Sequence, residues 1–293
     1  MLAGMWRISS WGPNMTDLPA RIDHVVINVL DRLDEAAETF RRLGFTLTPR
    51  GHHTLGSSNN LAIFGTDYLE LLGFEPGRGD TRPELWGSPP GLGGLVFKPS
   101  ADREFADKLR ALGVAASEPR EFSRPVALPE GSRDASFRVV NIDDAHAGGR
   151  VFFCHHYTPE LVWRDEWQHH ANGVAGIVEF AISCDDPQAI AAPFARLFGA
   201  SVQHPVAGGV ALTAGDAKVL FLTAGALAER YGPSTPSAMG GEPRMAALGL
   251  RTRDIGQTRA ALRAGAIKGV FDVERRIIIP ADQTCGLALS FFT

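Results

Sequence analysis

The chain has little of what marks several common protein classes. It holds only 3 cysteines in 293 residues. They lie far apart without CxxC spacing, which favours buried thiols in a reducing compartment over disulfides or a zinc site. The net charge of −4 gives no reason to expect a nucleic-acid partner or an anionic membrane. Because GxGxxG, P-loop, GxSxG and zinc-finger patterns are also absent, we expect no nucleotide cofactor.

Long apolar runs are missing as well. No stretch of about 18 apolar residues could form a membrane span, and residues 1–20 lack the continuous apolar core of a secretory signal. We therefore expect a cytoplasmic protein. Residues 1–20 mix Trp, Gly, Pro and Ser without a period and are predicted to be a disordered extension. Met15 is an alternative start, because the patterned chain begins only at Arg21.

One pattern occurs four times along the chain. In its first copy, a β-branched apolar strand at residues 22–29 leads into an amphipathic helix that a glycine ends. The glycines of the four copies are Gly44, Gly113, Gly199 and Gly265. Short extended segments broken by Gly, Asp or Asn follow each helix. The pattern predicts an α+β fold of four β-α-β-β-β modules, with extra length between the second and third.

The first half carries IDHVVINV, LDEAAETFRRLGF and DYLELLGF in this order. Together with the repeated module, these segments resemble the vicinal oxygen chelate superfamily (glyoxalase, bleomycin-resistance and extradiol dioxygenase proteins), and its glyoxalase-like domain proteins in particular. The resemblance implies two half-barrel domains at residues 21–160 and 173–293, joined by a linker at residues 161–172. It also implies that each pair of modules curls its strands into a cup around a site.

The resemblance places His24 and Glu70 in the N-terminal cup, because metal-using members carry a His on the first strand of a module and a Glu on the last. They would hold one divalent ion (Fe, Mn, Zn or Ni), and Glu70 would move a proton. Independently, Glu70 interrupts the apolar run YLELL, and a buried carboxylate needs a cation or hydrogen bonds. Strand alternation alone leaves open whether Glu70 faces the cup or solvent.

A third ligand is expected from the second module. Gly93 or Gly94 stands where glyoxalase enzymes carry one, so the candidates are His156 or, less favoured, His155 on a later strand. Alternation lets only one of these two histidines face the cup. Two histidines and a carboxylate would suit Fe(II) or Mn(II), with zinc as an alternative.

Four residues are predicted to contact substrate. His53 and Asn59 belong to a polar loop at the rim, Phe153 lies on an aromatic strand, and Arg164 could clamp a carboxylate. The alternative for the Arg164 segment is that its tryptophans anchor the linker. The C-terminal domain is predicted to be degenerate, because Glu179 replaces His24 and Leu220 replaces Glu70. That degeneracy argues against the extradiol dioxygenase type, which uses the second domain.

These features predict a small-molecule enzyme of the lyase, isomerase or dioxygenase type, working through an enolate or chelate in the N-terminal cup. The alternative is a non-catalytic binding or sequestration protein, as the bleomycin-resistance members of the superfamily are. An apolar, aromatic cup and an incomplete ligand set would both favour that alternative. The expected partner is a small-molecule ligand, and a homodimer is left open.

Overall fold

The computed structural model describes residues 18–79, 81–87, 89–101, 103–129, 131–273 and 275–293. Most of the predicted disordered extension at residues 1–20, with the alternative start at Met15, lies outside these ranges. Its last residues are part of the fold, since Ala20 is buried in the hydrophobic core and Leu18 packs against it. Within these ranges, no helix is long and apolar enough to cross a membrane.

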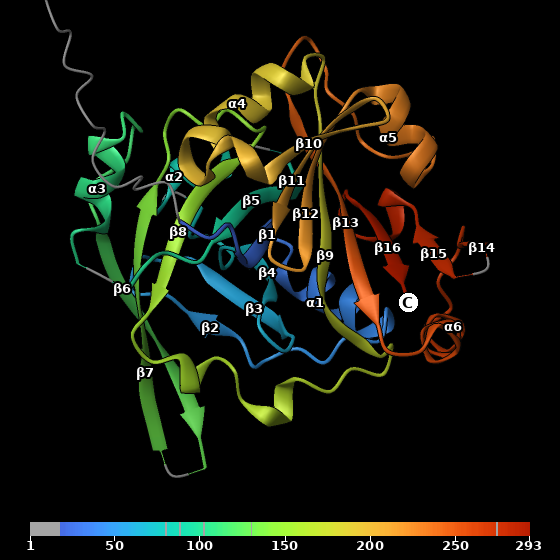
Figure 1. Cartoon of the computed structure of the whole chain (residues 1–293). Coiled ribbons are helices and arrows are strands. Elements are labelled where there is room, and N and C mark those ends of the chain that lie inside the picture. The colour runs from blue at the N-terminus through green and yellow to red at the C-terminus, as the bar shows by residue number, and fades with distance from the viewer. Residues whose placement is uncertain (1–17, 80, 88, 102, 130, 274) are drawn as a thin grey trace, which may run out of the picture.

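The first half of the chain forms an eight-stranded sheet in the order β2-β3-β4-β1-β5-β8-β7-β6 (Figure 1). Its strands are β1 (Ile22–Leu30), β2 (Gly51–His52), β3 (Ser58–Ile63), β4 (Tyr68–Gly73), β5 (Gly91–Phe97), β6 (Arg120–Leu128), β7 (Gly131–Asn141) and β8 (Arg150–His156). Its helices are α1 (Leu33–Arg42), α2 (Pro83–Trp86) and α3 (Phe105–Ala111). We call the concave face of this sheet the N-terminal cup.

The second half repeats the arrangement in a sheet of order β10-β11-β12-β9-β13-β16-β15-β14. Its strands are β9 (Val174–Ser183), β10 (Gln203–Val206), β11 (Gly209–Ala214), β12 (Ala217–Leu222), β13 (Arg244–Thr252), β14 (Phe271–Val273), β15 (Arg276–Ile279) and β16 (Ala288–Phe292). Its helices are α4 (Pro187–Phe198), α5 (Ala224–Tyr231) and α6 (Ile255–Ala264). In each half, the first strand pairs in parallel with the fourth and antiparallel with the next module's first strand. The predicted α+β fold of paired modules is confirmed.

The helix-ending glycines serve two different purposes. Gly44 adopts a φ of +88°, the left-handed conformation that favours glycine at a helix end. Gly265 instead has a φ of −78°. A Cβ on Gly265 would lie 1.8 Å from the carbonyl oxygen of Arg42, so this glycine is needed where the end of α6 meets α1.

The two sheets share one hydrophobic core on the faces that α1, α3, α4 and α6 cover. Helix α1 contacts α6, α4 packs on β11 and β12, and β5 touches β13 directly. At this junction the rings of Phe97 and Phe198 lie 4.8 Å apart. Since each side of the core is completed by the other half, the two halves form one body, and their concave faces point away from this core.

Helix α5 covers the concave face of the second sheet. Its Leu227 and Tyr231 pack against Leu220 and Leu222 of β12. Tyr231 Oη also donates a hydrogen bond of 2.6 Å to Glu179, which Arg230 pairs with as well. In the first half, the corresponding connection between β4 and β5 carries only the four-residue helix α2. A binding cavity can therefore form more readily in the N-terminal cup.

Candidate functional site

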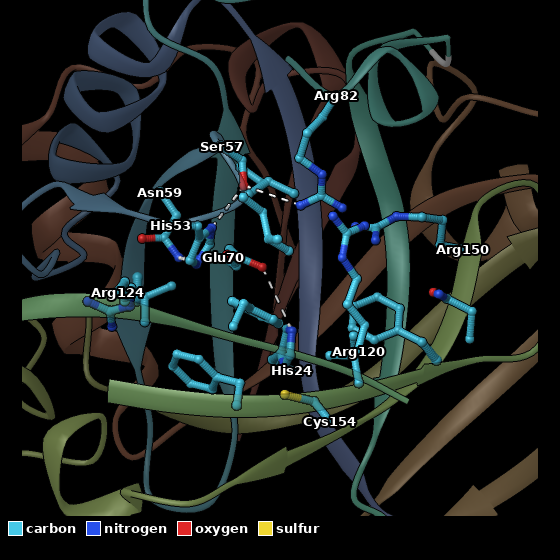
Figure 2. Close-up of a pocket in the computed structure, with 18 of the residues that line it drawn as sticks. His24, His53, Ser57, Asn59, Glu70, Arg82, Arg120, Arg124, Arg150 and Cys154 are labelled. Atoms are coloured by element: carbon cyan, nitrogen blue, oxygen red, sulfur yellow. Dashed lines mark hydrogen bonds and ion pairs between the residues drawn. The ribbon is translucent and has the colours of Figure 1, made fainter. Parts of the chain in front are cut away.

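The N-terminal cup contains a cavity with about 690 Å³ of empty space, a figure that includes space open to solvent. Strands β1, β3, β4, β6, β7 and β8 contribute to its walls, and the loop after β2 forms its rim. His24 and Glu70 both lie on this cavity (Figure 2). They are 3% and 7% exposed, so both polar groups are held away from bulk water.

His24 and Glu70 face one another across neighbouring strands. Strand β1 pairs in parallel with β4 so that Val26 is opposite Glu70 and His24 opposite Tyr68. The imidazole stacks on the Tyr68 ring at 4.4 Å. This leaves His24 Nε2 at 3.7 Å from Glu70 Oε2. The question that strand alternation left open is thus answered, because Glu70 points into the cup.

Asp23 lies on the same side as its neighbour His24. Its Oδ2 is 2.7 Å from His24 Nδ1, although regular strand alternation would place the two on opposite faces. The pairing of β1 with β5 shifts register between Ile22 and His24. Such a β-bulge adds one residue to a strand and redirects its side chain. Regular alternation along β1 therefore does not hold at Asp23, and its carboxylate reaches the His24 ring.

Three cationic or hydrogen-donating groups surround the Asp23 carboxylate. Besides His24, His156 Nε2 lies 2.9 Å from Oδ2, and Lys98 Nζ lies 2.8 Å from Oδ1. Burial alone would raise the pKa of Asp23, but His156 and His24 outweigh it and hold that pKa well below its usual value. An ionised Asp23 accepts the proton of His24 Nδ1, and this assignment from the hydrogen-bond network leaves the Nε2 lone pair facing the cavity.

Glu70 is held on its other side by an amide. Asn59 Nδ2 donates a 2.6 Å hydrogen bond to Glu70 Oε1 and lies 3.2 Å from His53 Nε2. His53 Nδ1 reaches Ser57 Oγ at 2.9 Å, and burial lowers the pKa of His53 to about 4. Burial raises the pKa of Glu70, but His24, His53 and the Asn59 hydrogen bond together bring it below its usual value. Glu70 is therefore a carboxylate at neutral pH.

Comparison with known proteins identifies the relatives of this fold. Residues 22–198, more than half of the chain, match the family model described as a glyoxalase-like domain. The chain belongs to this family. The predicted membership of the vicinal oxygen chelate superfamily is thereby confirmed, and the search of curated proteins finds no match.

Several solved structures show the same fold at low identity. A hypothetical protein from Staphylococcus aureus superposes with a TM-score of 0.64 at 12% identity, covering 92% of this chain and 98% of that one. A triple mutant of 4-hydroxymandelate synthase from Streptomyces coelicolor gives 0.54 at 12%, covering 93% and 92%. A xylose isomerase-like TIM barrel/4-hydroxyphenylpyruvate dioxygenase fusion protein gives 0.58 at 11%, covering 99% and 51%. At such identities the likeness establishes the fold alone.

The three predicted metal ligands do not meet at one point. His156, rather than His155, does turn toward the cup side of the sheet, where it contacts Asp23 and Trp163. Its Nε2 is directed at Asp23, however, which lies at the Nδ1 side of the His24 ring, whereas Glu70 lies at the Nε2 side. His24 and Glu70 therefore supply only two convergent donors.

A different group of potential ligands comes together behind His24. Asp23, Cys154 and His156 are the only three such residues in the described ranges whose ligand atoms all lie within 4.8 Å of one another. This group does not suit a metal ion either. The Lys98 ammonium already neutralises Asp23, and burial raises the pKa of the Cys154 thiol so that it stays protonated. The donor sets present do not fit a metal held by three protein ligands.

Gly94 shows why the second module adds no ligand from its first strand. A Cβ at this position would lie 2.9 Å from the Cβ of Val26 and 3.6 Å from the Phe152 ring. The contact with Val26 on β1 is therefore too short for a side chain at position 94, whereas the distance to Phe152 on β8 is an ordinary one.

Two predicted substrate contacts need correction. Phe153 points out of the cup into the shared core, where it packs against Phe105 at 4.8 Å. By alternation along β8, Phe152 takes its place on the cavity wall. Arg164 is paired with Glu166 and does not line the cavity. His53 and Asn59 both lie on the cavity wall, and their contact with a substrate stays a prediction.

The cavity also has four arginines that the sequence analysis did not single out. They are Arg82, Arg120, Arg124 and Arg150. A sequence signal existed for two of them. On β6, arginines at positions 120 and 124 alternate with Phe122 and Val126 on one strand face, and apolar residues on that face indicate that it is buried.

Proposed function

We propose that the protein is an enzyme that moves a proton on a small molecule bound in the N-terminal cup, as an isomerase or lyase. His24 is the general base of this proposal. The arrangement of Asp23, His24 and Glu70 carries it, because one carboxylate orients the imidazole and the other faces its free Nε2 at 3.7 Å. A carboxylate that holds a histidine tautomer in this way is a recurring device in general-base catalysis.

His24 suits the role of base better than Glu70 does. The pKa of Glu70 lies below its usual value despite burial, and a good general base has a pKa near the working pH. Glu70 instead stays ionised beside the imidazole. When Nε2 takes a proton, Glu70 on one side and Asp23 on the other stabilise the imidazolium that forms.

The chemical step can be written without a further reactant. A C–H bond next to a carbonyl breaks, its proton passes to His24 Nε2, and the electron pair moves to the carbonyl oxygen to give an enolate. Arginines on the cavity wall supply the positive field that stabilises this oxygen. When the α-carbon carries a hydroxyl group, the hydroxyl proton moves to the carbonyl oxygen and His24 returns its proton to the former carbonyl carbon, which completes an isomerisation. When the carbon next to the enolate carries a leaving group instead, its expulsion completes a lyase reaction.

Hydrogen–deuterium exchange tests the first half-reaction without knowledge of the final product. The protein is incubated in D2O with pyruvate, phenylpyruvate, 2-oxoglutarate, hydroxyacetone and dihydroxyacetone, and loss of the C–H signal is followed by NMR. We expect exchange above buffer with at least one compound. The substitution His24→Gln should slow it about 10²-fold or more, the usual contribution of a general base.

His52→Gln is the matched control. It is the same substitution, made on β2 at a side chain that is 60% exposed. It should retain the wild-type rate. Equal exchange in the wild type and the His24→Gln variant, or no exchange with any compound, would remove the proposal.

A second candidate function is binding without turnover. The aromatic wall formed by Phe122, Phe137 and Phe152 favours it, as does the lack of a third metal ligand. In that case a ligand would raise the melting temperature by mass action, and no proton would exchange in any bound compound. The same pair of measurements therefore separates the two functions.

A further inference from the structure

The wall of the cavity that we propose as the active site is rich in arginine. Its described residues include four arginines and one carboxylate, that of Glu70. With its pKa near 4, the neighbouring His53 is neutral. The net charge of the whole chain, by contrast, is −4. Guanidinium groups gathered in a cavity attract anions.

Three of the arginines gather on one side of the cavity (Figure 2). Arg82 directly precedes α2, Arg120 is the first residue of β6, and Arg150 is the first residue of β8. Arg82 Nη1 lies 3.5 Å from Ser57 Oγ. The Arg150 guanidinium lies 4.9 Å from the centroid of the Phe152 ring. Guanidinium groups from three separate elements converge here, and their planar donor pairs match carboxylate and phosphate oxygens.

The fourth arginine gives an independent indication. Arg124 is 3% exposed, and its Nη2 atom has no hydrogen-bond partner among the described residues. Burial lowers the pKa of Arg124, yet a guanidinium remains charged in proteins. Arg124 also has no ion pair with any acid of the described chain, since Glu70 is held by Asn59 instead. A buried, unpaired charge is costly and calls for a counter-charge.

Aromatic rings line another part of the wall. Phe122 and Phe137 stack at 5.2 Å, and Phe152 faces them from β8. We infer that the cup takes a small organic anion, with a carboxylate or phosphate group on Arg82, Arg120 and Arg150 and an aromatic or apolar body against these phenylalanines. The inference assigns a substrate class to the proposed function. The bound anion is a substrate only if the proposed function holds.

Calorimetric titration with benzoate, phenyl phosphate and benzamide tests the inference on the intact protein. Benzamide has the shape of benzoate without its charge, so we expect it to bind about tenfold or more weakly, the effect of losing a charge-assisted hydrogen bond. Tighter binding of phenyl phosphate or of benzoate identifies the preferred oxyanion. Benzamide binding as tightly as benzoate, or no binding by either anion, overturns the inference.

Variants locate the anion. Arg150→Gln should weaken benzoate about tenfold, whereas Arg133→Gln should not, because Arg133 pairs with Glu160 on the exposed part of β7. Arg124→Gln should weaken benzoate too and, by removing an unpaired buried charge, raise the melting temperature of the ligand-free protein. A lower melting temperature with unchanged benzoate affinity would assign Arg124 a purely structural role and contradict its part in the site.

Glu70→Gln and His24→Gln separate this inference from the proposed function. Both should keep benzoate binding, and Glu70→Gln should strengthen it by removing the only negative charge on the described wall. Anion binding without any proton exchange in the wild type would refute the proposed function alone. Exchange of neutral hydroxyacetone through His24, with no anion bound by any variant, would refute this inference alone.

Discussion

Asp67 offers a test of how the two halves are joined. It precedes β4, and its Oδ1 accepts a 3.0 Å hydrogen bond from the backbone N–H of Ile177 on β9. Burial between the halves raises the pKa of Asp67 to about 7, from an ordinary value of 3.8. Between these two pH values the folded protein holds a proton that the unfolded chain releases. Raising the pH through this window therefore lowers the free energy of unfolding.

The size of the effect follows from the shift. About three pH units correspond to at most about 4 kcal/mol, but Asp67 is partly exposed, and solvent screening reduces this to about 1–2 kcal/mol. The substitution Asp67→Asn keeps an oxygen to accept from Ile177 and removes the charge. We expect it to stabilise the protein by about 1–2 kcal/mol at pH 8 and by much less at pH 5.

Urea denaturation at pH 5, 6.5 and 8 measures this difference, with unchanged m-values as the check that the transition remains comparable. Asp216→Asn is the control, because its side chain is 87% exposed and should give a pH-independent difference near zero. If Asp67→Asn differed from the wild type by the same amount at all three pH values, ionisation of Asp67 would not be the cause. A destabilised variant at pH 8 would refute the reasoning outright.

Three further predictions concern a close strand contact, a buried hydrogen bond and metal binding. Gly94→Ala should lower the free energy of unfolding by about 1–3 kcal/mol in urea, because its methyl group would clash with β1; an unchanged value would mean that the strands can separate. Tyr231→Phe should cost about 1–3 kcal/mol, since it removes a hydrogen bond to buried Glu179, whereas a neutral effect would place solvent at that carboxylate. Chelator-treated protein should show the same melting temperature with or without Mn²⁺, Zn²⁺ or Ni²⁺, because His24 and Glu70 supply only two donors and Lys98 already neutralises the Asp23 group; a rise that is absent from the His24→Ala/Glu70→Gln variant would reinstate the metal site.

The fold could be predicted from sequence because its signals are local and repeated. Each module shows a β-branched strand, an amphipathic helix and a glycine within about 25 residues, so four copies reinforce one another. The purpose of Gly265 could not be predicted this way. It is set by contact with Arg42, more than two hundred residues earlier, which no local pattern reveals.

The site could be predicted only as far as strand positions allow. His24 and Glu70 lie on the cavity because regular alternation and the family pattern agree there. Where the strand departs from regularity, alternation is no guide. The bulge at Asp23 makes a residue that regular alternation would place on the far side the partner of His24, and a bulge leaves little trace in a single sequence.

The arginines show the same limit in a different form. Arg82, Arg120 and Arg150 come from a loop and two strands that are distant in sequence, and an isolated arginine is most often a solvated surface residue. Only the tertiary fold brings them together, because β6 and β8 lie on either side of β7 and the loop before α2 borders the cup. Yet the choice of ligand depends on this convergence more than on the histidine and glutamate. Since a base at His24 can act on many carbon acids, the positive wall is what would restrict the substrate to anions, and Arg150→Gln should therefore relax substrate choice rather than abolish proton transfer.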